Sequence, residues 1–159
     1  MFREMRRKDR HVGTEVGIEL LEKGDYGILS LLGDDDYPYG VPMNYAYADG
    51  NIYLHGFLEG HKIDAIKKHS KVCFTVVGET EVLPDQVSTN YTSVIVFGKA
   101  EVVESSNADA RGIAFNALMN KYVPGEKERT DAYIHEHAKD TNAIKIEIEH
   151  ISCKHRNVK

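Results

Sequence analysis

The stretch YPYGVPMNYAYADGNIYLHGF, residues 37–57, predicts two strands joined by a tight turn, and it decides the fold class. Over 37–48, large side chains alternate with small or polar ones, a period that is typical of a β-strand. Asp49-Gly50 accepts the positive φ angles that a two-residue hairpin requires. We therefore expect residues 52–57 to return alongside as the second strand.

Two prolines, Pro38 and Pro42, interrupt the first of these strands. Proline cannot donate a ladder hydrogen bond, so we expect the strand to lie at a sheet edge or to be bulged there. One interpretation is that Pro42 protects this edge from aggregation. The other is that the unpaired backbone and the small side chains of 40–46 receive the edge of a flat aromatic ring. Flavin mononucleotide and pyridoxal phosphate each combine such a ring with a phosphate.

The rest of the chain contains four more strand-like runs, without the regular alternation of strand and helix that marks a parallel sheet. They lie at 26–32, 71–77, 91–104 and 143–151, with a bulge expected at Gly98 and a polar loop at 78–90. Six strands of this kind indicate an antiparallel barrel with peripheral helices. The length suits one domain, which we place over residues 1–159.

Four short helices are expected around the sheet, at 14–23, from 60 to 69 or 70, from the cap SSN at 105–107 to near 122, and at 131–139. Thr14 is the expected N-cap of the first helix, and Gly24 is its expected stop. The third helix has a predicted buried face at the helical period, made by Ala110, Ile113, Ala114, Ala117 and Leu118.

Composition and charge exclude several classes of protein. With 42% apolar and 28% charged residues, the chain is typical of soluble globular domains. The net charge of −5 argues against nucleic acid as a partner, and no apolar run is long enough for a secretory signal or a membrane anchor. Two cysteines without C-x-x-C spacing argue against a thiolate zinc site and favour the reduced cytoplasm.

Residues 1–13 form a basic arm, which carries four of the seven arginines within MFREMRRKDR. One interpretation of this arm is a solvated terminus. The other is a segment that grips an anion or a neighbouring subunit.

EGHK, residues 59–62, places a glycine, a histidine and a lysine at a predicted helix start. Free N–H groups and the helix dipole favour an anion there, and His61 and Lys62 add donors and positive charge. A solvated helix cap is the alternative. The histidines at 55, 61 and 69 lack the spacing of a metal site, so we expect no metal. The chain also lacks the G-x-S-x-G, G-x-G-x-x-G and P-loop motifs.

Four segments together resemble the nitroimidazole-resistance branch of the pyridoxamine-phosphate-oxidase-like flavoproteins. In chain order they are MRRKDR, YGILSLLGDDDYPYGVPMNYAYADGNIYLHG, EGHKIDAIKKHSKVCFTVV and YTSVIVFGKAEVV, over roughly residues 5–104. The resemblance implies a split β-barrel that binds FMN, in a homodimer whose interface builds two flavin sites.

Carried over by position, the resemblance also assigns site residues. The flavin ring would be bordered by Val41, Pro42, Met43 and Asn44, and beside it would lie His55 and Gly56. The phosphate would be held by Gly60, His61, Lys62 and Ser93. His55 is the implied catalytic residue, and a structural histidine bonded to a backbone carbonyl is the alternative.

The expected function is that of an FMN-dependent oxidoreductase, which reduces small, flat, electron-poor compounds such as nitroimidazoles with NAD(P)H or another reductase product as the donor. A pyridoxamine-phosphate-type oxidase is an alternative, although the C-terminal CKHRNVK supplies only Arg156 in place of an arginine-rich substrate signature. A flavin-binding or storage protein without turnover is the other alternative, and related split barrels also host haem or a deazaflavin.

Overall fold

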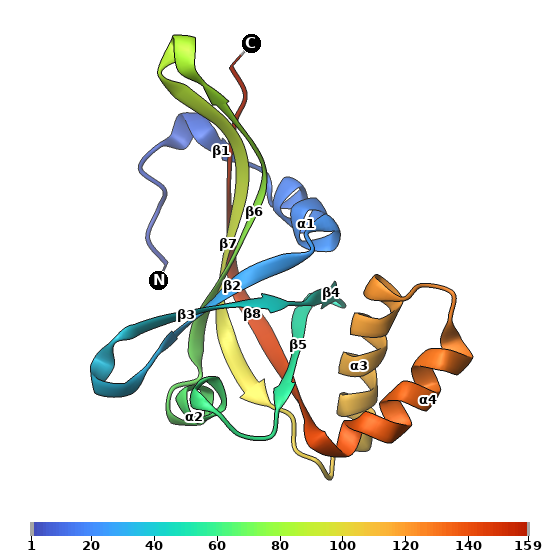
Figure 1. Ribbon diagram of the computed structural model, residues 1–159. Coiled ribbons are helices and arrows are strands. Elements are labelled where there is room, and N and C mark those ends of the chain that lie inside the picture. Colours follow the sequence, from blue (N-terminus) through green and yellow to red (C-terminus); the bar gives the residue numbers. More distant parts are fainter. Residues whose placement is uncertain (1, 159) are drawn as a thin grey trace.

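The computed structural model describes residues 2–158, so Met1 and Lys159, the ends of the predicted domain, lie outside the described residues. Within that range one antiparallel sheet has the strand order β3-β2-β6-β7-β8-β5-β4, and β1 pairs with β8 (Figure 1). The strands are β1 His11–Val12, β2 Tyr26–Leu32, β3 Pro38–Asn44, β4 Ala46–Ala48, β5 Asn51–Phe57, β6 Lys71–Leu83, β7 Ser88–Val102 and β8 Thr141–Arg156. The predicted mainly antiparallel β-architecture is confirmed.

The described sheet has eight strands where six were predicted. The predicted strand 37–48 breaks at Tyr45 into β3 and β4, and the two-residue β1 carries no sequence pattern. Because β3 and β4 lie at opposite edges of the sheet, the chain passes from one edge to the other at Tyr45. The sheet therefore curls into a barrel that is joined along this seam by the chain itself.

The crossing at Tyr45 is held by a hydroxyl group from a helix. The side chain of Tyr45 is fully buried. The backbone N–H of Tyr45 donates a hydrogen bond to the Tyr122 hydroxyl at 3.0 Å. That hydroxyl lies 2.6 Å from the carbonyl of Asp25 and 2.9 Å from the carbonyl of Tyr45. A hydroxyl has one proton, so it donates to one of these two carbonyls at a time. Tyr122 thus satisfies backbone groups that have left the ladder.

The helices are α1 Thr14–Lys23, α2 His61–Lys68, α3 Ala108–Tyr122 and α4 Lys127–His137. The first helix has its predicted bounds and ends at Gly24, but its N-cap is Gly13 rather than Thr14. In Figure 1, α2 lies at one end of the barrel and the α3–α4 pair lies beside β4 and β5. The barrel interior is filled by alternate strand residues, including Leu29, Leu54, Phe74, Val94, Val96, Ile144 and Ile146.

The predicted buried face of α3 is wrong at one position. Ile113 is 51% exposed, whereas Phe115, which was not predicted, is 6% exposed. Phe115 joins a second cluster with Tyr53 and Ala143, against which Ile134 of α4 packs. The buried stripe is displaced toward Phe115 because α4 covers that side of the helix.

The predicted loop at 78–90 is also wrong, because β6 continues to Leu83 and β7 begins at Ser88. The two arms pair from Thr80–Tyr91 to Leu83–Ser88, after a register shift that follows Val77. This ribbon projects beyond the barrel, and the side chain of Val82 is 70% exposed. A ribbon without a fully buried face leaves no clear apolar alternation for a sequence pattern to detect.

The predicted bulge at Gly98 is confirmed. The pairing of β7 with β8 shifts between Phe97 and Gly98, and the extra residue, Glu149, lies on β8. A side chain at Gly98 would collide with the carbonyl of Glu147, so the close approach requires glycine there.

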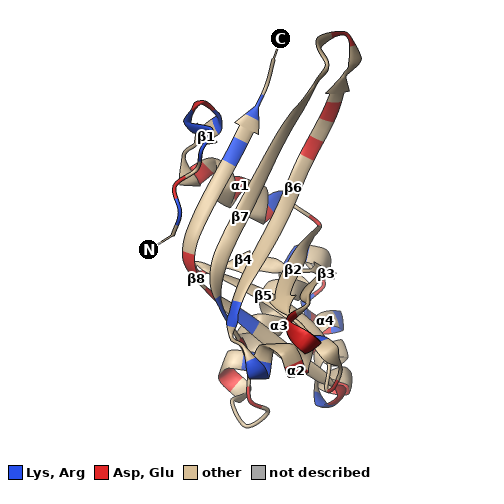
Figure 2. Ribbon diagram, turned by 90° about the vertical axis from the view of Figure 1, so that its left-hand side faces the viewer, with Lys and Arg blue, Asp and Glu red and all other residues tan. Residues whose placement is uncertain are grey.

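Charge separates along the projecting part of the sheet. Glu79 and Glu81 lie on β6, and Lys154 and Arg156 lie on β8, with β7 between them (Figure 2). The ends of the two outer strands therefore carry opposite charge.

We expect Tyr122→Phe to lower the free energy of unfolding by about 1–3 kcal/mol, because buried backbone groups at the Tyr45 crossing lose their partner. Urea unfolding measures the change. Tyr37→Phe is the matched control, since Tyr37 is 74% exposed and its loss of a hydroxyl should shift stability by less than about 0.5 kcal/mol. Equal unfolding midpoints for the two variants would contradict the role assigned to Tyr122.

Candidate functional site

The open edge of β3 presents free backbone groups. The N–H of Gly33 donates to the carbonyl of Tyr37 at 2.8 Å, which fixes the hydrogen-bonded pairs of this hairpin at odd-numbered residues. Among the described strands β3 pairs only with β2, so the backbone groups of Gly40, Pro42 and Asn44 point to the open edge. Pro42 stands where no ladder donor is required, which confirms the predicted edge position.

Side chains alternate across β3 as the sequence predicts. Val41 and Met43 pack against the barrel core, whereas Pro42 and Asn44 are exposed. The Asn44 amide donates to the carbonyl of Asp25 at 3.0 Å. Of the four residues predicted to border a flavin ring, two therefore present their side chains outward, and the other two support the strand from inside.

A second open edge faces the first. β4 covers β5 only over Asn51–Tyr53, so among the described strands the rest of β5 pairs with β8 alone. β3 and β5 contact one another, and in Figure 1 they run in different directions away from the β4 corner that follows Tyr45. His55 and Gly56 lie on the uncovered part of β5, where successive side chains point to opposite faces of the sheet.

The start of α2 lies against the Gly56 face of β5. Gly60 is the N-cap with a φ of 128°, and its carbonyl accepts from the N–H of Ile63 at 2.8 Å. The first N–H groups of the helix have no acceptor within it. The stem of Lys62 crosses Gly56 so closely that a Cβ there would lie 2.7 Å from the Lys62 Cε. Gly56, Gly60 and Lys62 are thus brought together.

His61 has other neighbours than Lys62. Its ring stacks on Tyr39, with centroids 4.3 Å apart and planes at 16°, and its Nε2 accepts from the N–H of Asp34 at 3.4 Å. The carboxylate of Asp34 lies 3.7 Å from the same nitrogen. The imidazole of His61 therefore ties α2 to the β2–β3 turn.

His55 faces α3 and α4, on the side of β5 opposite Gly56. It lines a cavity of about 130 Å³ with residues of both helices, among them Phe115, Met119, Tyr133 and His137. The side chain of His55 remains partly open to solvent. Partial burial, together with the positive charge of Lys62, lowers the pKa of His55. The ring is accordingly neutral at neutral pH.

The sequence interpretation missed the helical walls of this cavity. It named no residue of α4 as a site residue, and its buried face of α3 included Ile113 but not Phe115. The available signal was the spacing of Phe115 and Met119, which are four residues apart and share one helix face.

Within residues 2–158 no group of three His, Cys, Asp or Glu side chains is placed to hold a metal ion.

Ser93 lies elsewhere in the chain. It pairs with Val77 and Lys154, whereas His55 pairs with Ala143. Ala143 and Lys154 are eleven positions apart along β8, which corresponds to about 36 Å of strand. The structure does not bring Ser93 to Lys62 within one chain.

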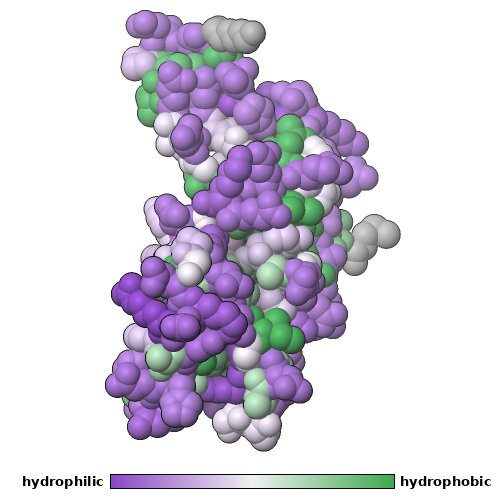
Figure 3. Space-filling model, turned by 90° about the vertical axis from the view of Figure 1, so that its right-hand side faces the viewer, coloured by the Kyte–Doolittle hydropathy of each residue, from purple (hydrophilic) through white to green (hydrophobic). Residues whose placement is uncertain are grey.

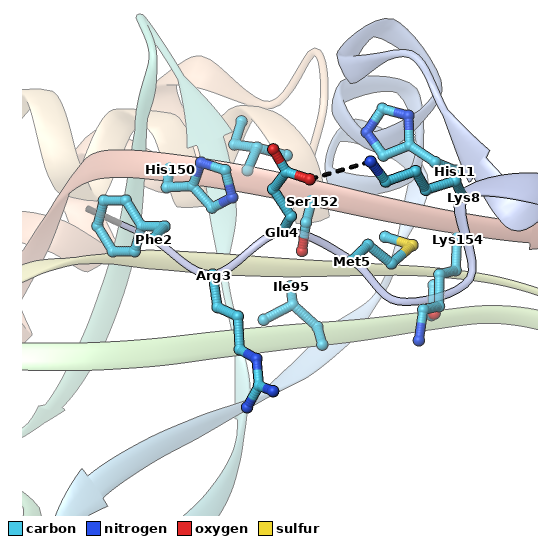
Figure 4. A pocket seen from close by; sticks show the side chains of 12 residues that line it. Phe2, Arg3, Glu4, Met5, Lys8, His11, Ile95, His150, Ser152 and Lys154 are labelled. Atoms are coloured by element: carbon cyan, nitrogen blue, oxygen red, sulfur yellow. Dashed lines mark ion pairs between the residues drawn. The ribbon is translucent and has the colours of Figure 1, made fainter.

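Ser93 instead lines a larger cavity of about 500 Å³ beneath the N-terminal arm. Figure 4 shows the arm lying over β7 and β8, with Phe2 stacked on His150 at 4.7 Å and an ion pair between Glu4 and Lys8. The floor comes from Ser93 and Ile95 of β7 and from His150, Ile151, Ser152 and Lys154 of β8. The position of the arm over these strands was not predictable from the sequence.

The surface on the α3–α4 side is mostly hydrophilic, and its apolar side chains form small separate patches (Figure 3). No helix in the described part of the chain is long and apolar enough to cross a membrane.

Comparison with known proteins gives one family match and many structural matches. The model of the family described as pyridoxamine 5'-phosphate oxidase matches residues 15–155. The comparison with curated proteins finds no significant match.

Three solved structures illustrate the likeness. A candidate 5-nitroimidazole antibiotic resistance protein from Bacteroides thetaiotaomicron is 18% identical, with a TM-score of 0.70 and coverage of 96% of this chain and 95% of that one. An FAD and haem binding protein from Mycobacterium smegmatis is 20% identical, with a TM-score of 0.80 and coverage of 94% and 74%. An FAD-binding protein from Mesorhizobium loti is 22% identical, with a TM-score of 0.65 and coverage of 94% and 97%. At these identities the likeness shows the fold.

We expect NMR titration to find the pKa of His55 below the usual range of histidine, and Lys62→Met to raise it. The rise should be partial, because burial is the larger cause and remains in the variant. His55→Gln identifies the signal by removing it. Lys68→Met, at the other end of α2, is the control and should leave the pKa unchanged. A His55 pKa that does not respond to Lys62→Met would contradict the proximity of the two side chains.

Proposed function

The chain belongs to the pyridoxamine 5'-phosphate oxidase family, and from that premise we propose that it is an FMN-dependent oxidoreductase acting on small, flat, electron-poor compounds. The observation that carries the proposal is the pair of diverging edges of β3 and β5, with Lys62 and the start of α2 between them. We take residues 1–159 as one flavin-binding domain.

The residues present fit a ring with a single phosphate. Backbone groups of Gly40, Pro42 and Asn44 at the open edge match the polar rim of a flavin ring, and Lys62 with the first N–H groups of α2 matches a phosphate. We favour FMN over FAD because the ring of His61 is engaged with Tyr39 and Asp34. A second phosphate would meet the acidic turn Asp34–Asp36.

The proposed residue roles follow from this placement. When bound, FMN supplies two-electron transfer between a donor such as NAD(P)H and an electron-poor acceptor. Backbone N–H groups of the β3 edge stabilise negative charge on the ring. The neutral imidazole of His55 exchanges a proton with a compound at the ring.

We also propose that the working unit is a homodimer. Ser93 and Lys62 are too far apart in one chain to bind the same phosphate. Ser93 can therefore contact the phosphate bound at Lys62 only when the two residues come from different subunits. The N-terminal arm lies over the surface that contains Ser93 and so borders that interface. The likeness to a candidate 5-nitroimidazole antibiotic resistance protein supports nitro compounds as the acceptor class.

The first experiment is a spectroscopic titration of the purified protein with FMN, FAD and haem. FMN should bind most tightly, with the visible bands of an oxidised flavin. Tighter binding of FAD would correct the cofactor, and a Soret band with no flavin bound would overturn the proposal.

We expect Lys62→Ala to weaken the binding of FMN about tenfold to hundredfold, because a hydrogen bond to a charged group contributes ~1.5–3 kcal/mol. Fluorescence titration measures the loss, and riboflavin, which lacks the phosphate, should lose little affinity. Lys68→Ala, an exposed lysine of the same helix, is the control. Equal weakening of FMN and riboflavin would reject Lys62 as the phosphate ligand.

We expect 2-methyl-5-nitroimidazole to reoxidise the anaerobically reduced holoprotein, and His55→Gln to slow this reaction at least about tenfold at unchanged FMN affinity, since a positioned acid contributes 10²–10⁴-fold. Stopped-flow absorbance measures the rate, with His135→Gln as the control. A wild-type protein that is never reoxidised by the nitro compound would favour the storage alternative.

A further inference from the structure

The cavity between β5, α3 and α4 is small and largely apolar. Phe115, Met119, Ile134 and Ala138 line it from the two helices and the turn that follows them. Its volume of about 130 Å³ is close to that of engineered cavities, about 150 Å³, that bind one benzene molecule. A single flat ring is therefore the largest ligand that fits without rearrangement.

Polar atoms stand at one side of this cavity. His55 reaches it from β5 and His137 from the end of α4, and Tyr133 lies beside His137 with ring centroids 4.3 Å apart. Tyr133 is 55% exposed and Phe115 is 6% exposed, so tyrosine and histidine form the rim while phenylalanine forms the floor. Imidazole and phenol donors at the rim suit a ring that bears acceptor substituents.

The half-buried side chain of Arg111 links two walls of the cavity. The Arg111 guanidinium donates to the carbonyls of Ala138 and Thr141, which fixes the turn after α4 against α3. The same guanidinium lies 5.3 Å from the centroid of the Phe115 ring. Arg111 therefore ties the turn after α4 to α3, the helix that carries Phe115.

We propose that this cavity binds one uncharged, planar, single-ring compound with hydrogen-bond acceptors, and that it is the acceptor-substrate pocket of the protein. The assignment as a substrate pocket rests on the proposed function, because His55 lines this cavity and is also the residue proposed to exchange a proton beside the flavin ring. The ring-binding property itself depends only on the residues that line the cavity. A neutral His55 and an apolar floor disfavour a charged ligand.

The experiment is an NMR titration of the full-length protein with 2-methyl-5-nitroimidazole, with and without added FMN. The ring-proton signals of His55 and His137 should shift together and saturate, whereas His135, which is on α4 but outside the cavity, should not shift. Ala138→Leu fills the cavity and should weaken binding at least about tenfold. Ala132→Leu, the same change on the exposed face of α4, should not weaken it.

A second pair of variants covers the case in which Ala138→Leu fails to fold. His137→Ala removes a rim donor and should weaken binding about fivefold or more, while His135→Ala should leave it unchanged. Equal affinities within both pairs, or no saturable shift of His55 and His137, would overturn the proposal. Saturable shifts without FMN binding would refute the proposed cofactor and leave the ring pocket standing, so the two failures are distinguishable.

Discussion

The crossing of the chain at Tyr45 is the constraint on which the rest of the structure depends. β3 and β4 lie at opposite edges of the sheet, and only this residue separates them in the chain. A sheet whose edges are tied so closely must curl, and strand twist permits it. Tyr45 fills the interior of the curl against Phe74, with ring centroids 4.9 Å apart. Because the edges meet at one point, β3 and β5 diverge from it and leave backbone exposed.

The C-terminal end of α3 links that crossing to the cavity. Lys121 donates to the carbonyl of Gly24 at 2.6 Å and lies 3.9 Å from the centroid of the Tyr45 ring, and burial lowers its pKa. Tyr122, the next residue, bonds the backbone of Tyr45. One turn earlier Leu118 is buried, and Phe115 and Met119 line the cavity. A helix fixed to the barrel seam therefore also sets the distance from His55 to its far wall.

The elements that were predicted best from the sequence have one buried face and one solvent-exposed face. β2 has its predicted bounds, β8 contains the isoleucine alternation, and the Asp49-Gly50 turn has positive φ at both residues. The break at Tyr45 was hidden because the period of two continues through it: Tyr45 and Tyr47 both stay on the inner side. The β6–β7 ribbon was missed for the opposite reason, since neither of its faces is fully buried and the pattern that marks a strand is absent.

The candidate site was predictable where it is local and not where it depends on tertiary contacts. Gly60 and Lys62 follow from a helix start, whereas the stacking of His61 on Tyr39 and the approach of α4 to β5 do not. His55 turns toward α3 and α4, while Lys62 crosses Gly56 on the other face of β5. A ligand that touches both side chains must therefore lie across the open edge of β5, which is the edge left uncovered by the divergence from β3.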